Sequence, residues 1–155
     1  MKELKFKRLN GNEYIPKRAY EHDAGYDICL PYDAVIEADN VTTLDLNVSF
    51  GIEPGHTGLL FPRSSLAKNN IVSIPVPIDA GYNGSIKLIV RNYSKEYYQV
   101  SKGDRLCQLV IMPIVTPLLK EVDLLPTSER GNKGFGSSGL GGINEKVITD
   151  IKNNR

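Results

Sequence analysis

Short runs in which apolar and polar residues alternate occur along most of the chain and predict β-strands. In the clearest run, Ile86, Leu88 and Val90 alternate with polar neighbours, which places one side of a strand in a core and the other in solvent. Glycine and proline separate these runs, and almost no helical period interrupts them. The other predicted strands lie at residues 4–9, 26–30, 35–36, 41–50, 57–61, 71–74, 97–100 and 105–114. This pattern indicates an all-β sandwich or barrel.

Two local signals predict how some of these strands are connected. Asn83-Gly84 favours a type I′ turn, in which both central residues have positive φ. We therefore expect a tight hairpin here, with residues 85–92 as its return strand. Pro62 suits the first position of a helix and Ser64 or Ser65 suits its cap, so one short helical turn is expected at this point.

The composition fits one globular domain and argues against several classes of protein. The 155 residues are 41% hydrophobic and 24% charged, which argues against disorder. The net charge of +1 supplies no strong field for direct nucleic-acid or membrane binding, and no apolar run approaches the length of a membrane span. Cys29 and Cys107 form no CxxC motif, so we expect reduced thiols and a cytoplasmic protein. The N-terminal residues lack the apolar core of a signal peptide.

The character of the chain changes after Pro126, and we expect a β domain at residues 1–126. Residues 127–139 are rich in glycine and serine and predict a mobile tail. Phe135 stands alone among glycines there, and a nucleobase could supply its missing packing partner. The simpler interpretation is a flexible linker to residues 140–155, an extension of unknown role.

The segment around Asp79 has the strongest appearance of an active site. Asp79 follows apolar Ile78, and a carboxylate at that position is costly to bury unless something uses it. Tyr82 follows three residues later in the same predicted loop. The pair could hold a water on one side and a sugar on the other. Alternatively, Asp79 caps a turn and Tyr82 packs on a sheet.

Two further segments could bind phosphate or a metal ion. Arg63-Ser64-Ser65 offers a guanidinium, two hydroxyls and backbone N–H groups at a helix start, a suitable place for phosphate. The alternative is a helix cap beside a surface arginine. Asp27 could bind a cation or its waters, as Mg²⁺ often keeps several waters and few carboxylates. The alternative is an exposed aspartate on a strand.

Gln108 could hydrogen-bond a phosphate or position a water, or it could be structural. Its neighbours Asp104 and Arg105 are interpreted as a local turn pair. His22 and His56 lie in polar turns without partners at ligand spacing, so we interpret both as surface residues rather than members of a catalytic or zinc motif.

Five of these segments, taken together, resemble the ordered motifs of the trimeric deoxyuridine triphosphatase (dUTPase) family. They appear in the family's order and at compatible spacings, within a resemblance that runs from about residue 4 to residue 139. The five motifs are residues 24–27 (AGYD), 62–67 (PRSSLA), 78–84 (IDAGYNG), 103–109 (GDRLCQL) and 130–139 (RGNKGFGSSG).

The resemblance implies a distorted jelly-roll β-barrel that assembles as a homotrimer, with each active site drawing motifs from more than one subunit. It also implies that residues 127–139 form a mobile, glycine-rich lid that closes over the nucleotide. It implies hydrolysis of dUTP to dUMP and pyrophosphate with Mg²⁺, which limits uracil incorporation into DNA and supplies dUMP for dTMP synthesis. Asp79 would activate the attacking water, with Gln108 as a second catalytic residue, and Asp27 would reach the metal through water. The implied substrate-binding residues are Arg63, Ser64, Ser65, Ser73, Pro77, Ile78, Asp79, Tyr82, Lys87, Ile89, Gln108, Arg130, Phe135, Gly136, Ser137 and Ser138.

The sequence departs from the family pattern beside the predicted base pocket. Val76 stands where a glycine is usual and Pro77 where an aliphatic residue is usual, while Asn83 and Ser85 replace an arginine and an acid. Two rival functions stay open. A related dCTP deaminase would need a glutamate where this chain has Ile89, and an aliphatic side chain cannot move protons. A nucleotide-gated protein-binding module would use the same motifs for regulation.

Overall fold

The computed structural model describes residues 3–132 as eleven short strands and one helix, with every strand pair antiparallel. The elements are β1 (Lys5–Arg8), β2 (Tyr26–Cys29), β3 (Ala34–Ile36), β4 (Val41–Asp45), β5 (Val48–Gly51), β6 (His56–Pro62), α1 (Ser64–Lys68), β7 (Ile71–Ser73), β8 (Pro77–Ile78), β9 (Lys87–Asn92), β10 (Tyr98–Val100) and β11 (Arg105–Pro113). The predicted all-β architecture is confirmed. Within these residues the single helix has five residues, far too few to cross a membrane.

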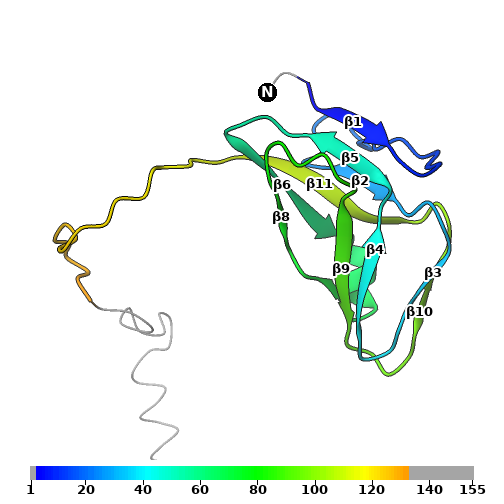
Figure 1. Cartoon of the computed structure of the whole chain (residues 1–155). Helices are drawn as coiled ribbons and strands as arrows, with labels where there is room; N and C mark the ends of the chain where they lie inside the picture. Colours follow the sequence, from blue (N-terminus) through cyan, green and yellow to red (C-terminus); the bar gives the residue numbers. More distant parts are fainter. Residues whose placement is uncertain (1–2, 133–155) are drawn as a thin grey trace, which may run out of the picture. The chain divides into compact units, whose positions relative to one another are not determined.

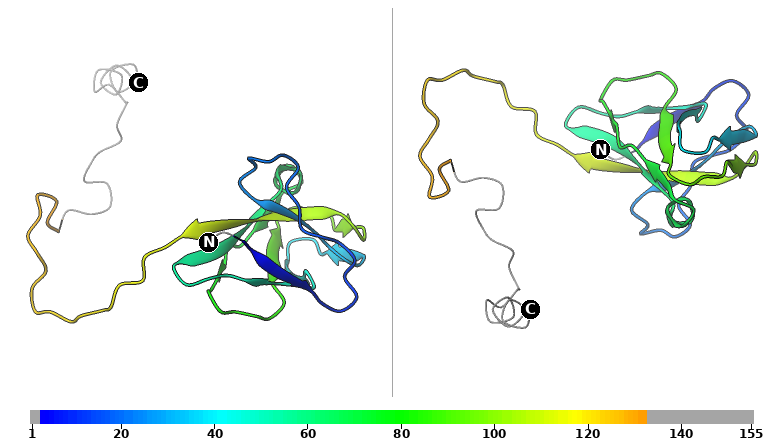
Figure 2. Two further views of the ribbon diagram at one scale, coloured as in Figure 1. Left: turned by 90° about the horizontal axis from the view of Figure 1, so that it is seen from above. Right: turned by 90° about the horizontal axis from the view of Figure 1, so that it is seen from below.

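The strands form two larger sheets and two pairs around one core. One sheet has the order β2-β11-β6-β8 and the other β4-β9-β7, while β1 pairs with β5 and β10 with β3 (Figure 1). Strand β11, yellow-green, lies between the much earlier strands β2 and β6 (Figure 2). The sheets enclose apolar side chains that are almost wholly buried, the largest being Phe50, Leu30, Ile36, Leu46, Leu66, Ile71, Leu88 and Leu109.

The predicted strand at residues 41–50 is two strands rather than one. Asn47 separates β4 from β5 with a left-handed φ of 49°, and its N–H donates to Oδ1 of Asp45. Beside this bend, the N–H of Leu46 donates to the carbonyl of Ile86. The apolar alternation continues through the bend, so hydrophobic periodicity alone does not reveal it.

The expected type I′ hairpin at Asn83-Gly84 is wrong. Neither residue has a positive φ, and the flanking strands separate: β8 pairs with β6, whereas β9 pairs with β4 and β7. The chain instead turns at residues 79–82, where the N–H of Tyr82 donates to the Asp79 carbonyl and Gly81 has φ of 84°. Positive φ at the third residue of this turn is the type II requirement that glycine meets most easily.

The expected helical turn is present, but its predicted start is wrong. Pro62 ends β6 instead of opening the helix, and Arg63 occupies the cap position. Neither Ser64 nor Ser65 caps α1, and no side-chain cap was found in the described structure. Leu66 is buried and fixes the helix to the core, so packing positions this single turn.

Asn92, at the end of β9, is buried and joins two parts of the barrel. Its Nδ2 donates to the carbonyls of Ile36 at 3.3 Å and Glu96 at 2.8 Å. Its Oδ1 accepts from the backbone N–H and the hydroxyl of Ser94. Because four contacts satisfy the amide, Asn92 can be buried without the cost of an unpaired polar group.

Contacts divide the chain into one unit, Met1–Pro117, and a second that begins at Leu118. All the strands and the helix named above lie in the first unit. The described part of the second unit, residues 118–132, contains no helix or strand. The expected lid at residues 127–139 and the extension at 140–155 stay predictions, and Phe135, Gly136, Ser137 and Ser138 lie outside the described residues.

Candidate active site

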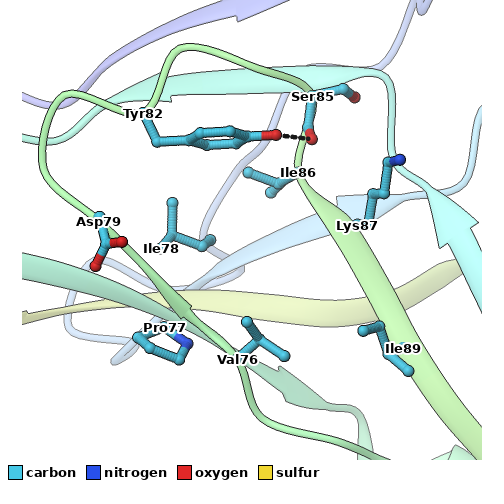
Figure 3. A pocket seen from close by; sticks show the side chains of 9 residues that line it. All are labelled: Val76, Pro77, Ile78, Asp79, Tyr82, Ser85, Ile86, Lys87 and Ile89. Atoms are coloured by element: carbon cyan, nitrogen blue, oxygen red, sulfur yellow. Dashed lines mark hydrogen bonds between the residues drawn. The ribbon is translucent and has the colours of Figure 1, made fainter.

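A cavity of about 300 Å³ opens between the segment that contains β8 and the start of β9. Figure 3 shows the side chains that face it from both segments. Asp79 contributes the carboxylate among the lining residues, and Lys87 the amine. The lining consists of Val76, Pro77, Ile78, Asp79, Tyr82, Ser85, Ile86, Lys87 and Ile89.

The ring of Tyr82 forms one wall of this cavity and is held from its far end. Its hydroxyl donates a 3.1 Å hydrogen bond to the carbonyl of Ser85, and the ring lies across the loop between them (Figure 3). Gly84 lies against the same ring, because a Cβ built there would be 2.6 Å from Cζ of Tyr82. Gly84 therefore serves the close approach of an aromatic ring and not the predicted turn.

Side chains from neighbouring strands anchor the loop that contains Asp79 and Tyr82. Ser49 Oγ donates to the carbonyl of Asn83 at 2.9 Å, and Thr57 Oγ1 donates to that of Ile78 at 3.0 Å. The hydroxyl of Ser85 donates to Oδ1 of Asp45. Within residues 3–132 the Asp79 carboxylate itself has neither hydrogen bond nor ion pair, so it is available to water or ligand.

A second group of charged side chains surrounds Asp27 on β2. Arg105 donates to Oδ2 of Asp27 at 3.2 Å, and Nη1 of Arg63 lies 3.7 Å from the same oxygen. Arg63, Ser65 and Arg105 also line a polar cavity of about 420 Å³. Two guanidinium groups share one carboxylate here, which leaves donors for an anion such as a phosphate chain.

Gln108 lies directly opposite Asp27 on the paired strand β11. Its side chain is partly buried against Gly25, where an added Cβ would be 2.9 Å from Oε1 of Gln108 and equally close to the Leu109 carbonyl. Gly25 therefore leaves the space that Gln108 occupies, and its role is close packing beside this second group.

The structure thus gathers the predicted residues into two places. Pro77, Ile78, Asp79, Tyr82, Lys87 and Ile89 line the first cavity, whereas Arg63 and Ser65 line the second, beside Asp27. Ser64 is exposed at the start of α1, and Ser73 is buried on β7; neither lines these two cavities. Arg130 belongs to the second unit.

Sequence reasoning missed three residues. Arg105 was expected to pair with adjacent Asp104, but its partner Asp27 is 78 positions away. No local signal pairs Asp45 with Ser85, since they lie 40 positions apart on different segments. The pairing of β4 with β9 brings the Ser85 hydroxyl to the Asp45 carboxylate, and the sequence alone does not show this register.

The histidines and cysteines do not contribute to either place. No cluster of three or more histidine, cysteine or acidic side chains suited to a metal is found in residues 3–132. Cys29 and Cys107 are free thiols, as expected. Burial raises the pKa of both, and most strongly that of Cys107, which is wholly buried.

Comparison with known families gives a match to the dUTPase model over residues 12–139. The chain belongs to the dUTPase family. A deoxyuridine 5′-triphosphate nucleotidohydrolase of Tropheryma whipplei is 40% identical over 130 residues, which cover 81% of this chain and 89% of that protein. The corresponding protein of Clostridium acetobutylicum is 34% identical over 143 residues, covering 90% and 99%.

Solved dUTPase structures share the fold. A mutant of the Staphylococcus bacteriophage 80alpha dUTPase with dUpNHpp has a TM-score of 0.83 and 33% identity, over 90% of this chain and all of that one. A mutant of the phage phi11 dUTPase, described with a structural Mg(II) ion, has a TM-score of 0.74 and 30% identity, over 79% and 97%. The all-β unit is accordingly the distorted jelly roll of the dUTPase family.

Proposed function

We propose that this chain hydrolyses dUTP to dUMP and pyrophosphate. The observation that carries the proposal is the first cavity, in which the Asp79 carboxylate and the Tyr82 ring are presented by one tight turn. A carboxylate with no partner among the described residues, such as that of Asp79, can orient a water and accept its proton. The aromatic wall beside it suits the apolar face of a sugar. The similar sequences and solved structures reported above are dUTPases, which supports the same substrate.

The reaction asks for positioning more than for covalent chemistry. The attacking water adds its oxygen to the α-phosphorus, Asp79 takes up its proton, and pyrophosphate leaves with the electrons of the broken P–O bond. Arg63, Ser64, Ser65 and Gln108 would hold the phosphate oxygens, where donors placed in advance stabilise the charge of the transition state. Pro77, Ile78, Lys87 and Ile89 would border the nucleoside, and Ser73, the last residue of β7, would also contribute to substrate binding.

The Asp27 group fits a magnesium ion bound together with substrate. Mg²⁺ in phosphate-transferring sites commonly keeps waters and takes one or two carboxylates plus substrate oxygens. Asp27 supplies such a carboxylate, and Oδ2 is the oxygen that its two arginine neighbours approach. When bound, the ion would neutralise phosphate charge, with Asp27 holding its waters. We propose Mg²⁺ as the cofactor on this basis.

We propose a homotrimer because the two places share no lining residue within one copy of the chain. A closed ring of three copies lets Asp79 of one copy and Arg63 of another complete each site. The alternate residues Val72, Ile74 and Val76 are 45–47% exposed, an apolar stripe that association would cover. Light scattering gives the assembly. Co-refolding the Asp79→Asn variant with the Arg63→Ala variant tests whether two copies share a site. Each variant should be inactive alone, and the mixture should recover activity.

Arg130, Phe135, Gly136, Ser137 and Ser138 would complete the site as a lid of residues 127–139. Phe135 would stack on the base, while the arginine and serines would bind the terminal phosphates. Closing such a segment would exclude water other than the reacting one. A cytoplasmic location is our expectation from the two free thiols, Cys29 and Cys107.

Pyrophosphate release from dUTP, dCTP, dTTP and UTP, each with Mg²⁺, tests the proposed function. We expect dUTP to be preferred to dCTP by about 10⁴-fold, because an exchanged donor and acceptor would leave buried groups unpaired. Comparable kcat/KM for the two would mean that Val76 and Pro77 rebuild the base pocket. Ammonia release from dCTP would favour the deaminase, although the cavity has Ile89 where that chemistry needs an acid.

A second candidate is a nucleotide-gated protein-binding module, alone or beside hydrolysis. One similar structure is the phage 80alpha dUTPase with dUPNHPP. Its description states that phage dUTPases control transfer of virulence genes by a proto-oncogenic G protein-like mechanism. It has 34% identity and a TM-score of 0.83 to this chain. A partner captured from a lysate with dUpNHpp but not without nucleotide would favour this role.

A further inference from the structure

Tyr82 is held in place by a chain of contacts that begins outside the cavity. The Tyr82 hydroxyl donates to the carbonyl of Ser85, and the hydroxyl of Ser85 donates to the carboxylate of Asp45. Asp45 is on β4 and does not line the cavity. The three residues thus connect a strand of the neighbouring sheet to the aromatic wall of the site.

The Asp45 carboxylate is oriented toward Ser85 by its own surroundings. Its Oδ1 also accepts from the N–H of Asn47 at 3.0 Å, which fixes the carboxylate against the bend between β4 and β5. Asp45 and Lys87 are directly paired on β4 and β9, yet in the described part of the chain no ion pair joins them. The carboxylate therefore binds Ser85 rather than Lys87, the residue opposite it in the strand pair.

Ser85 has little freedom once Asp45 holds it. The next residue, Ile86, donates its N–H to Val48 at 2.9 Å and accepts from Leu46 at 3.0 Å, so the backbone beyond Ser85 is fixed to the β4–β5 bend. Gly84 before it lies against the Tyr82 ring. The hydroxyl bond to Asp45 adds a further restraint on the residue whose carbonyl accepts from the Tyr82 hydroxyl (Figure 3).

We propose that Asp45 is a positioning residue which, through Ser85, sets how strongly the site prefers a 2′-deoxyribose to a ribose. The inference rests on the proposed function, in which Tyr82 borders the sugar. A ring fixed at its hydroxyl end would stay against the sugar and oppose an added 2′-hydroxyl. A ring released at that end can move outward and admit one, because Tyr82 is already 47% exposed.

The test compares kcat/KM for dUTP and UTP in the full-length protein and its variants. Taking the ratio of the two substrates cancels any general effect of removing a negative charge near a polyanion. Asp45→Ala and Ser85→Ala should each lower the dUTP preference about fivefold or more, the usual worth of one hydrogen bond. Asp45→Asn keeps an acceptor for the Ser85 hydroxyl and should recover part of the preference.

A matched control removes a different hydrogen bond from the same residue. The Asp45 N–H donates to the hydroxyl of Tyr32 at 2.9 Å, a contact that does not involve the carboxylate. Tyr32→Phe should therefore leave the dUTP-to-UTP ratio within about twofold of wild type, even if Tm falls. An equal change in Tyr32→Phe and Asp45→Ala would reduce Asp45 to a structural role and overturn the inference.

A double-mutant cycle with Tyr82→Phe tests the path itself. This change deletes the hydroxyl that reaches Ser85 and keeps the ring, so adding Asp45→Ala to it should produce no further loss of preference. An additive loss would show that Asp45 acts by another route.

Binding of dUMP and UMP, measured by calorimetry on the same variants, separates the two proposals. If wild type fails to hydrolyse dUTP but binds dUMP better than UMP, the proposed function falls while the Asp45 inference is still tested by binding. If wild type hydrolyses dUTP and Asp45→Ala leaves both ratios unchanged, only the inference falls. A wild type that neither hydrolyses dUTP nor prefers dUMP overturns both.

Discussion

Arg105 donates a 3.2 Å hydrogen bond to Asp27 across the β2–β11 pair, although 78 positions separate the two residues in the sequence. The contact gives Asp27 a fixed orientation beside Arg63. In the proposed site, an aspartate held in this way would keep the waters of the Mg²⁺ ion that binds together with the substrate.

Asp27→Asn should therefore raise the Mg²⁺ concentration for half-maximal hydrolysis by about 10-fold or more, the usual loss for groups that hold a metal's shell. Titration of activity with MgCl₂ at saturating dUTP measures this. Asp23→Asn makes the same chemical change outside the group, where the carboxylate accepts from the Tyr20 N–H, and should leave the titration unchanged. An unaltered titration in Asp27→Asn would remove this residue from metal binding.

Asp79→Asn should lower kcat by about 10²–10⁴-fold, the usual worth of a positioned acid or base. The amide is close in size to the carboxylate, so binding of a non-hydrolysable dUTP analogue should change little. Stopped-flow pyrophosphate release and calorimetry measure the two effects separately. Turnover within a few-fold of wild type would exclude Asp79 as the residue that activates water.

Gly84→Ala should lower kcat/KM for dUTP by about 10- to 100-fold, as expected when a side chain of a site is displaced by around an ångström. The new Cβ would meet the Tyr82 ring at 2.6 Å, so the ring must move. Gly51→Ala is the matched control, since a Cβ there would have its nearest neighbour at 3.6 Å. Equal activities for the two variants would contradict the assigned role of Gly84.

Because the thiols are buried, we expect the free energy of unfolding to decrease at alkaline pH. Burial holds the pKa of Cys107 far above its ordinary range and raises that of Cys29 less strongly. Above about pH 8.5 the unfolded chain loses these protons while the folded chain keeps them. The free energy of unfolding should then decrease with pH, by up to about 1.4 kcal/mol per pH unit for Cys107.

Urea unfolding under reducing conditions, between pH 7.5 and 10, measures this slope. Cys107→Ala should flatten it despite lowering the overall stability, whereas Cys29→Ala should flatten it less. A Cys107→Ala slope that matches wild type would assign the alkaline loss to other groups.

Truncation after Thr127 should leave Tm almost unchanged while slowing hydrolysis strongly. Every described strand lies before Leu118, so the described part of the removed segment, residues 128–132, contributes no strand to the barrel. The proposed lid residues Arg130, Phe135, Ser137 and Ser138 are all lost. Scanning calorimetry and steady-state kinetics test the two halves of this prediction, and full activity in the truncated protein would reduce residues 128–139 to a linker.

Local pattern was enough to predict the strands of the barrel and their buried faces. Ile86, Leu88 and Val90 are all buried, as their alternation requires. Asn-Gly, in contrast, occurs twice and makes a positive-φ turn only once. Asn10 and Gly11 have φ of 48° and 73°, with the N–H of Asn12 donating to Leu9. At Asn83-Gly84 the Tyr82 ring and the Ser49 hydroxyl determine the backbone instead.

The same limit applies to the site. Asp79 and Tyr82 are close in sequence, so one loop could be expected to present both. Arg105 and Asp45 depend on partners brought to them by strand pairing, and no local signal distinguishes them from turn or surface residues. Family resemblance identified the motifs, whereas the contacts that orient them come from long-range register.

The hydrogen bonds of Asn92 bear on how the molecule opens. Strands β3 and β10 have three residues each and too few ladder bonds to persist as an isolated pair. Because Asn92 on β9 holds the carbonyl of Ile36 and the loop before β10, we expect that pair to open together with the neighbouring sheet. The backbone amides of β3 and β10 should thus exchange with deuterium as slowly as those of β9. This end of the barrel would then open as one cooperative foldon, in which a single amide side chain links the opening of β3 and β10 to that of β9.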